Sequence, residues 1–398
     1  MLQRPKDTVH EDFSENFSKA LLEESRKDSC ESAPAESSFR PCLMHRRSFL
    51  AGTLGLMAGL FCAPPLTASG FGSTACAFAA DNTEHADILA EYAARLQYHM
   101  ENNGDLRLPA LSARDRRRAI PNDNRPPARR TPVTTLPPNS SALEGVVRRV
   151  HIESGEKVCA LTFDMCELAT TTTGFDADIV IWLQDNNIPA TFFMGGKWMR
   201  THERRVRQIL RDPLFEIGNH AWAHGNFALL SLKRMREEIL DTQSQYELLR
   251  EENIANAGRS GLGESLPPPE ALRLFRFPYG RSSEQALQLL NEYGLEPIQW
   301  DVVAETGGNN ASVSRARQVI NKVQPGSILL FHANLVPRGS FQLLRYVATG
   351  LQRKGYRFVT VGELLALGTP ERARDGYFEK PGDNAELDKR FGTEGTGR

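Results

Sequence analysis

Short apolar runs alternate with longer amphipathic stretches from residue 157 onward. Short apolar runs bounded by Gly, Pro or polar residues predict β-strands, and apolar residues three or four apart predict helices. The predicted strands are residues 158–163, 190–194, 214–217, 273–277, 297–302, 327–331 and 357–360. The predicted helices are residues 175–185, 203–211, 232–252, 283–293, 312–323 and 339–354, with a short one at 361–367.

This alternation indicates an α/β fold. When strands and helices alternate along a chain, the strands run parallel and are joined by right-handed crossovers. The alternating region, residues 157–368, has a size that suits a slightly short barrel of β/α units, and an open doubly wound sheet is the alternative. Gly and Pro cluster in residues 253–270, which predicts a long loop there.

The first 79 residues lack the pattern of a folded domain. Residues 1–43 are polar and aperiodic, which predicts disorder. Residues 44–79 hold paired arginines, a short apolar run and an Ala-x-Ala sequence, an order that resembles a twin-arginine export signal. An uncleaved anchor is the alternative. Because export signals stand at the start of a chain, we expect Met44 to be the true initiator and the protein to reach the periplasm or cell envelope.

Residues 80–156 are predicted to hold one helix and a linker. Apolar residues at helical spacing between residues 84 and 100 predict a lone docking helix. Residues 112–138 are rich in Arg and Pro, which predicts a disordered, extended linker. Contact between these arginines and an anionic envelope polymer or lipid headgroups is the alternative. Residues 369–398 are polar and are predicted to form a tail.

Overall composition excludes some classes of protein and changes little else. The chain carries 48 Lys and Arg against 49 Asp and Glu, so nothing global indicates a nucleic-acid partner. Of the six cysteines, only Cys159 and Cys166 fall in the alternating region, and we expect both to be free thiols rather than part of a disulfide framework.

Two histidines give the first indication of chemistry. His220 and His224 are four residues apart, a spacing that sets both imidazoles on one side of a helical turn, close enough to share one cation. They follow a predicted strand, and α/β enzymes keep their chemistry at the carboxyl ends of strands. A pair of ordinary surface histidines is the alternative.

Titratable or aromatic groups follow four further strands, so we expect them to gather with the histidines at one end of the sheet. They are Asp164, Arg276 with Tyr279, Trp300 with Asp301, and His332.

These motifs resemble, in the same order, those of the polysaccharide deacetylases that share the NodB homology domain, the carbohydrate esterase 4 type. They are LTFD at 161–164, NHxxxH at 219–224, RxPYG at 276–280, WD at 300–301 and LxH at 330–332. The resemblance covers residues 157–365 and implies a distorted (β/α)7 barrel. It also implies a divalent metal, zinc first with cobalt as the alternative, and removal of acetyl groups from N-acetylated sugars.

The resemblance assigns a role to each motif. His220 and His224 bind the metal, and Asp164 is the general base. Arg276 pairs with Asp164 and holds it ionised. The backbone N–H of Tyr279 donates to the oxyanion.

The last two motifs supply the acid and the acetyl pocket. His332 protonates the leaving amine, and Asp301 is the carboxylate expected to keep His332 charged. Trp300 and Leu330 are expected to form the apolar wall for the acetyl methyl group.

Two motifs depart from the family pattern. The first usually has two adjacent aspartates, base and metal ligand, whereas Met165 stands second here, in the sequence FDMCE. A thioether is a poor zinc ligand. We favour Glu167 as the replacement, Cys166 is the other candidate, and Asp164 binding the metal itself is a third option. The fourth motif, WDVVAETGG, is eroded, and Asp301 or Glu305 is expected to substitute there.

The leading interpretation is therefore a metal-dependent hydrolase that removes N-acetyl groups from an N-acetylhexosamine polymer, peptidoglycan or another envelope polysaccharide. The departures at Met165 and in the fourth motif leave two alternatives open. One is a carbohydrate-binding relative that has lost catalysis, and the other is an amidase acting on a small, non-sugar amide.

Overall fold

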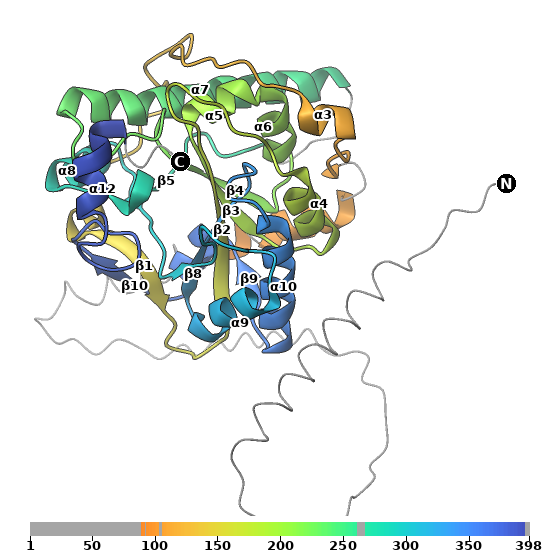
Figure 1. The fold of residues 1–398 in the computed structure, drawn as a ribbon. Helices are drawn as coiled ribbons and strands as arrows, with labels where there is room; N and C mark the ends of the chain where they lie inside the picture. Colours follow the sequence, from red (N-terminus) through yellow and green to blue (C-terminus); the bar gives the residue numbers. More distant parts are fainter. Residues whose placement is uncertain (1–88, 92, 103–105, 261–266, 395–398) are drawn as a thin grey trace, which may run out of the picture. The chain divides into compact units, whose positions relative to one another are not determined.

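A computed structural model describes residues 89–91, 93–102, 106–260 and 267–394, the side chains of 257–260 excepted (Figure 1). The expectations for residues 1–79, including the export signal and the start at Met44, lie outside the described residues. Residues 89–91 and 93–102 are helical, in agreement with the helix predicted around residues 84–100. No helix in the described ranges is both long and apolar enough to cross a membrane.

The described strands form one ten-stranded sheet. They are β1 (Val146–His151), β2 (Val158–Met165), β3 (Ala190–Met194), β4 (Phe215–Asn219), β5 (Leu274–Phe275), β6 (Glu296–Pro297), β7 (Val302–Val303), β8 (Ser327–His332), β9 (Arg357–Val359) and β10 (Thr369–Ala373). All seven predicted strands are present, although the one predicted at 297–302 is divided between β6 and β7.

The sheet curls into a barrel. Its order is β10-β1-β8-β2-β3-β4-β5-β6, with β7 paired to β8 and β9 to β2, and the pairs from β2 to β9 are parallel. A bridge between Val147 and Ile298 brings the β6 end back to β1, and the N–H of Gln299 donates to the carbonyl of Val147 at 2.8 Å. This closure confirms the distorted barrel and excludes an open doubly wound sheet.

Helices cover the outside of the barrel (Figure 1). They are α3 (Ala113–Arg117), α4 (Ala177–Asp185), α5 (Gly196–Thr201), α6 (Glu203–Leu210), α7 (Leu232–Ser260), α8 (Glu284–Glu292), α9 (Val313–Lys322), α10 (Ser340–Arg353), α11 (Val361–Ala366) and α12 (Ala385–Phe391), with 3₁₀ turns η1 (Ser140–Glu144), η2 (Pro278–Gly280) and η3 (Gly392–Glu394). Side chains at the N-caps fix several starts: the Ser283 and Ser312 hydroxyls accept from backbone N–H groups of α8 and α9, and Thr360 with Glu363 forms a capping box on α11.

The two faces of β2 and β8 explain where the core and the site lie. Successive side chains of a strand point to opposite faces. Cys159, Leu161, Phe163 and Met165 therefore belong to a large apolar cluster with side chains of the outer helices. The alternate residues, Val158 and Ala160 on β2 with Ile328 and Leu330 on β8, share a second cluster inside the barrel. Asp164 and His332 continue this inner face at the carboxyl ends of their strands.

Strands β1 and β10 form an antiparallel pair that sequence patterning missed. Residues 146–151 fall in the predicted linker, and residues 369–373 fall in the predicted tail. Neither alternates cleanly between apolar and polar residues, because Arg148 and Arg149 interrupt β1 and β10 reads TPERA. An ion pair between the two strands contributes to their pairing instead, with Arg149 of β1 2.6 Å from Glu371 of β10.

The prediction of a disordered Arg/Pro-rich linker is wrong for the described residues 106–138, which we call the belt. The belt runs over the barrel and its helices, and its arginines meet carboxylates on those helices. The pairs are Arg107–Asp185, Arg116–Asp178, Arg129–Glu247 and Arg130–Asp241, at 2.5 to 2.9 Å. Glu247 also accepts from the N–H groups of Val133 and Thr134. The belt is held by charge and backbone hydrogen bonds, which hydrophobic periodicity does not report.

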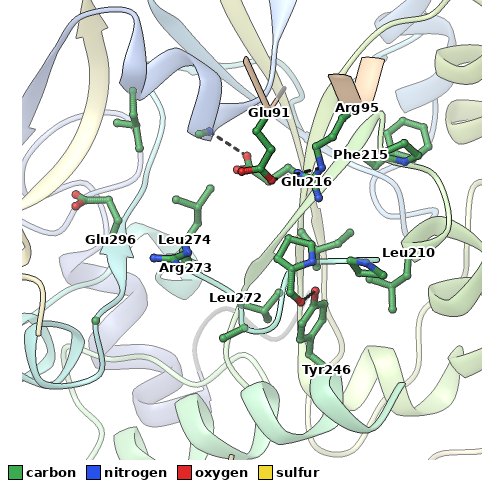
Figure 2. Close-up of a pocket in the computed structure, with 18 of the residues that line it drawn as sticks. Glu91, Arg95, Leu210, Phe215, Glu216, Tyr246, Leu272, Arg273, Leu274 and Glu296 are labelled. Carbon is green, nitrogen blue, oxygen red and sulfur yellow. Dashed lines mark hydrogen bonds and ion pairs between the residues drawn. The ribbon is translucent and has the colours of Figure 1, made fainter. Parts of the chain in front are cut away.

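A cavity of about 600 Å³ lies at the amino ends of β4 and β5, lined by Tyr246, Leu272 and Leu274 among others (Figure 2). Glu216 in its wall accepts from the N–H of Gly362 at 3.1 Å. The predicted site residues follow the carboxyl ends of the strands, so this cavity lies at the other end of the barrel from them.

Candidate active site

Asp164 and Arg276 form the buried base of the site. The Nη1 atom of Arg276 donates to Asp164 Oδ1 and to the Thr162 hydroxyl, each at 2.8 Å, and its Nη2 donates to the carbonyl of Gln299 at 3.0 Å. Both side chains lie inside the barrel, where burial disfavours charge. Burial alone would raise the pKa of Asp164, but neighbouring positive charge, that of Arg276 above all in this arrangement, outweighs it and holds that pKa below its ordinary value. Asp164 is therefore a carboxylate fixed in place.

The two histidines lie in an irregular turn after β4, and the expectation that they share a helical turn is wrong. Ala221 and His224 both have positive φ, 63° and 60°. The turn is held by side chains on either side of it: Asn219 Oδ1 accepts from the N–H of Ala221, and Glu238 of α7 accepts from the N–H of Ala223. These contacts bring the rings of His220 and His224 edge to face with centroids 4.8 Å apart.

A backbone hydrogen bond fixes which nitrogen of His220 faces the site. Its Nδ1 lies 2.9 Å from the carbonyl of Arg276, and a carbonyl only accepts, so Nδ1 carries the proton. Nε2 then presents its lone pair. Among the described residues it is buried without a hydrogen-bond partner, although Asp164 Oδ2 lies 3.4 Å away. Burial lowers the pKa of both His220 and His224, which favours the neutral, metal-binding form.

Cys166 supplies the third donor beside the imidazoles. The donor atoms of Cys166, His220 and His224 all lie within 4.8 Å of one another. Met165 points the other way, into the outer apolar cluster, because it occupies an outward-facing position of β2. Asn334 holds Cys166 in place, because its Nδ2 donates to the carbonyl of Cys166 at 3.1 Å and lies 4.0 Å from Cys166 Sγ.

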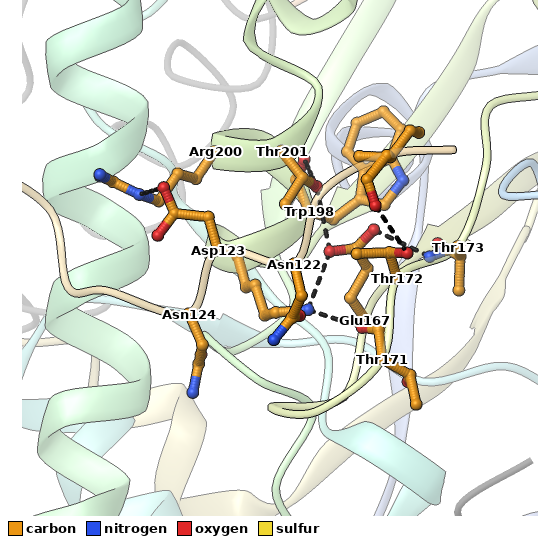
Figure 3. A network of polar contacts seen from close by, with 12 residues as sticks. Asn122, Asp123, Asn124, Glu167, Thr171, Thr172, Thr173, Trp198, Arg200 and Thr201 are labelled. Carbon is orange, nitrogen blue, oxygen red and sulfur yellow. Dashed lines mark hydrogen bonds and ion pairs between the residues drawn. The ribbon is translucent and has the colours of Figure 1, made fainter. Parts of the chain in front are cut away.

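The preference for Glu167 as third ligand is corrected by the structure. Glu167 is fully buried in a different network, where its carboxylate meets Lys197 Nζ and the Thr201 hydroxyl at 3.0 Å and the N–H of Thr173 at 2.9 Å (Figure 3). A carboxylate that neutralises a buried ammonium cannot turn away without leaving that charge unpaired. Glu167 therefore organises the loop after β2, and Cys166 faces the imidazoles.

The donor set fits a divalent cation. Thiolate and neutral imidazole are the preferred zinc ligands, and His220 contributes a buried, unpartnered Nε2 to this group of donors. Burial, with the nearby charges of Asp164 and Glu167, raises the pKa of the Cys166 thiol above its usual value. A cation beside the sulfur reverses that preference, because coordination deprotonates a thiol.

Tyr279 lies beside His224 in a strained turn. Its backbone is left-handed, with φ 58° and ψ 10°, and its ring meets the His224 ring edge to face at 4.3 Å between centroids. Within the described part of the chain, no acceptor lies on the Tyr279 N–H, whereas the two following amides donate to Phe277 and Pro278 carbonyls. The N–H is thus available to a ligand beside the histidines.

His332 pairs with Glu305 and not with Asp301, so the prediction for Asp301 is wrong. His332 Nδ1 lies 2.5 Å from Glu305 Oε2, and Glu305 Oε1 accepts from the His332 N–H. Burial lowers the pKa of His332, but Glu305 outweighs it, and the net pKa is raised. Strand register explains the exchange: Val302 pairs with Leu329, so residue 301 lies level with the start of β8 and residue 305 with His332. Asp301 instead accepts from Ser327 and from the Ile328 N–H.

Trp300 and Leu330 lie inside the barrel, with 2% and 1% of their surfaces exposed. Trp300 donates from Nε1 to the carbonyl of Phe378 at 3.0 Å, and the Phe378 ring packs edge-on against it. The expectation that Trp300 presents a binding wall is therefore wrong, because a residue of the supposed tail covers it. A role for Leu330 beneath the acetyl group stays a prediction.

Sequence reasoning missed the residues that orient the site from outside the motifs. They are Glu238, which accepts from the Ala223 N–H, and Asn334, which donates to the Cys166 carbonyl, with Glu305 named only as a substitute in the fourth motif. Each acts on a segment distant in sequence, so no local spacing indicates it. For Cys166 the signal was present: a thiol one residue past an outward-facing Met, at the end of a strand that carries an acid.

Comparison with known proteins connects this arrangement to a family. Residues 151–254 match the family model described as polysaccharide deacetylase. A peptidoglycan-N-acetylglucosamine deacetylase of Bacillus cereus is 27% identical over 218 residues, covering 54% of this chain and 91% of that protein. A chitooligosaccharide deacetylase of Azorhizobium caulinodans is 27% identical over 186 residues, 44% of this chain and 80% of that one.

Among solved structures, a carbohydrate esterase family 4 pseudoenzyme from Bacillus anthracis is 22% identical and covers 55% of this chain and 68% of its own. Its TM-score is 0.44, too low to indicate a shared fold by itself.

Proposed function

Because this chain belongs to the polysaccharide deacetylase family, we propose that it is a metal-dependent hydrolase that removes N-acetyl groups from an N-acetylhexosamine polymer, peptidoglycan first. The family and the named relatives support a hydrolase acting on the carbon–nitrogen bond of N-acetyl groups. The polymer, the metal and the residue roles below are our proposal.

One observation carries the proposal: the groups we assign as base, acid, oxyanion donor and three metal ligands converge from the ends of four strands, β2, β4, β5 and β8. Asp164 and Arg276 lie inside, next to the His220 and Cys166 donors. His224 adjoins Tyr279. His332 ends β8, which is hydrogen-bonded to β2 with His332 opposite Asp164. Amide hydrolysis needs each of these groups.

Cys166, His220 and His224 would hold the metal. A bound divalent cation supplies a Lewis acid for the acetyl carbonyl and lowers the pKa of water. The protein prepares this site by fixing the His220 tautomer through the Arg276 carbonyl and by holding the peptide of Cys166 with Asn334.

The side chains divide the proton transfers between them. Asp164 accepts the proton of the attacking water as its oxygen bonds to the carbonyl carbon, and Arg276 keeps Asp164 charged beforehand. The Tyr279 N–H donates to the carbonyl oxygen as negative charge develops there. His332, kept protonated by Glu305, gives its proton to the nitrogen as the carbon–nitrogen bond breaks. Acetate and a free amine leave, and one water is consumed.

The direct test is acetate release from N-acetylglucosamine oligomers by purified protein loaded with zinc or cobalt. We expect acetate and free amine in equal amounts, and loss of both in a His332→Ala variant that still binds oligomers. Oligomer binding by the wild-type protein with no acetate would contradict catalysis and favour the carbohydrate-binding alternative. Acetate release from small non-sugar amides but not from oligomers would favour the amidase alternative.

The export signal expected in residues 44–79 completes the proposal, because an envelope polymer requires the enzyme outside the cytoplasm. Replacing Arg46 and Arg47 with Lys should retain the precursor in the cytoplasm, as checked by fractionation and by mass spectrometry of the mature N-terminus. Unchanged export of that variant would contradict the twin-arginine assignment.

A further inference from the structure

The C-terminal segment, residues 376–394, folds onto the turn that carries Tyr279. It holds helix α12 and the turn η3, and it was expected to be a polar tail. The segment contacts three successive residues of the turn, Tyr279, Gly280 and Arg281. It also contacts the segment after β4 that carries His220 and His224, residues 220–226, which we call the histidine loop.

Tyr279 is held from both of its ends. Asn384, which is 6% exposed, donates from Nδ2 to the Tyr279 carbonyl at 2.8 Å. The Tyr279 hydroxyl donates to the carbonyl of Glu394 at 2.9 Å. A non-Gly residue in the left-handed region costs on the order of 1–3 kcal/mol and persists only where its surroundings impose it. The Tyr279 carbonyl belongs to the peptide unit shared with Gly280, so Asn384 restrains ψ of Tyr279. That restraint contributes to fixing the left-handed backbone of Tyr279, on which the direction of its own N–H depends.

The next two residues are gripped by the same segment. Gly280 has φ +69°, and a Cβ there would lie 2.3 Å from the Tyr377 carbonyl, so only Gly permits this approach. Arg281 donates to the Gly376 carbonyl and pairs with the carboxylate of Asp388. The turn is thus held by backbone carbonyls and by a carboxylate of residues about a hundred positions later in the chain.

The segment also ties this turn to the histidine loop. Asp388 accepts from Asn226 Nδ2 at 2.8 Å, and the carbonyl of Thr393 accepts from the Asn226 N–H at 2.9 Å. Asn226 is two residues past His224. Asp388 therefore bridges Arg281, beside the oxyanion donor, and Asn226, beside a metal-binding histidine.

Phe378 anchors the segment in the barrel. Its ring packs against Trp300, and its carbonyl accepts from Arg148 Nη2 and Trp300 Nε1, each at 3.0 Å. The guanidinium of Arg148 lies 3.9 Å above the Tyr377 ring centre. Because Phe378 fixes one end of the segment in the core, the segment can restrain the conformation of Tyr279 instead of moving with it.

We propose that residues 376–394 are a positioning element of the active site, and that Asn384 is the positioning residue that holds Tyr279 in its left-handed conformation, with the Tyr279 N–H toward the reacting carbonyl. The catalytic consequence rests on the proposed deacetylase function. The positioning itself does not, since it is a statement about the turn.

The kinetic test uses Asn384→Asp, which keeps the shape and removes both donor hydrogens, and Asn384→Ala. A well-placed oxyanion donor is worth about 10²–10³ in kcat, so misplacing it should lower kcat by at least about tenfold with KM within about twofold. Metal content should stay at the wild-type value, and both variants should remain folded at the assay temperature, although the lost buried hydrogen bond lowers the midpoint of thermal unfolding. Lys389→Ala is the matched control: it lies on α12, its ammonium pairs with Glu386 on the same helix, and it should change nothing.

Hydrogen exchange provides a readout that needs no activity. The Gly280 and Arg281 amides donate to Phe277 and Pro278 at 3.2 and 3.0 Å and report the closed turn. Peptides covering residues 277–281 should exchange faster in both Asn384 variants, and not in Lys389→Ala.

The two readouts separate the two proposals. Unchanged exchange in the Asn384 variants contradicts positioning, whether or not the wild-type protein releases acetate. Faster exchange with unchanged kcat contradicts the catalytic role of the segment, and loss of metal together with kcat points to a structural role instead. Absence of acetate from the wild-type protein contradicts the deacetylase function alone.

Discussion

The inner face of the barrel and the outer segments of the chain are built by different means. On the inner face, alternate residues of β2 and β8 continue from an apolar cluster into Asp164 and His332. The belt, residues 106–138, and the C-terminal segment, residues 376–394, are instead held by ion pairs and by side chains bonded to backbone, such as Arg130–Asp241 and Asn384–Tyr279. The two outer segments both reach the site. Asn384 of the C-terminal segment bonds Tyr279, and Asn124 of the belt accepts from Trp222 in the histidine loop.

The difference indicates that the groups proposed to react and the groups that orient them occupy different kinds of position in the fold. Reacting groups occupy strand ends, where the fold brings them together. The groups that orient them lie on different kinds of segment: Glu238 on helix α7, Asn334 in the loop after β8 and Asn384 in the C-terminal segment. The inner face should therefore control chemistry, and the outer segments should control geometry and modest amounts of stability.

The largest expected effect is on the inner face. Asp164→Asn keeps a hydrogen-bond acceptor for Arg276 but removes the base, and general base catalysis contributes about 10²–10⁴ in rate. We expect kcat to fall by that order, measured as acetate release from N-acetylglucosamine oligomers. Asp178→Asn, which cuts a belt ion pair on α4, is the control and should leave kcat unchanged. A full-rate Asp164→Asn enzyme would exclude Asp164 as the base.

Glu167→Gln should produce the largest loss of stability. It leaves the Lys197 ammonium buried without its counter-charge, and breaking a buried pair costs about 3–5 kcal/mol. Urea unfolding followed by circular dichroism measures the change. The comparison with Glu251→Gln, a partly exposed partner of Arg129, sharpens it, because an exposed pair contributes little. Equal stability of the two variants would contradict the buried network.

Glu305→Gln should shift the pH profile. Glu305 raises the pKa of His332, so His332 stays protonated to higher pH than an ordinary histidine. Without the carboxylate that pKa falls, and the alkaline limb of kcat/KM should move to lower pH. On the alkaline side we expect roughly a tenfold loss of rate. A limb that stays in place would show that His332 is not the acid or that Glu305 does not control it, whereas Asp301→Asn should leave the limb unmoved.

The smallest expected effect lies on the belt. Arg107→Gln removes the partner of Asp185, where the two side chains are 44% and 39% exposed, and exposed pairs contribute about 0–1 kcal/mol. The free energy of unfolding should fall within that range and the loss should shrink in high salt. A loss of several kcal/mol would show that the belt is an integral part of the fold rather than a covering.

Particular elements show how far the sequence carries. The seven strands and the barrel follow from apolar runs and alternation, and the motif residues Asp164, His220, Arg276 and His332 follow from their positions after strands. Glu305, and not Asp301, is the partner of His332, because the register between β7 and β8 cannot be read from a degenerate motif. The prediction of Glu167 over Cys166 fails because ligand chemistry does not tell which of two neighbouring residues faces the histidines. The belt, β1 with β10, and the C-terminal segment depend on partners far along the chain.

The central claim is that Cys166, and not Glu167, joins His220 and His224 around the cation. Cobalt-loaded protein tests it, because thiolate bound to cobalt gives a near-ultraviolet charge-transfer absorption that carboxylate does not. The account predicts this band in the wild-type protein and in folded Glu167→Gln, and its loss with a fall in bound metal in Cys166→Ala. A wild-type spectrum without the band, or a Cys166→Ala protein that keeps both band and metal, would contradict it.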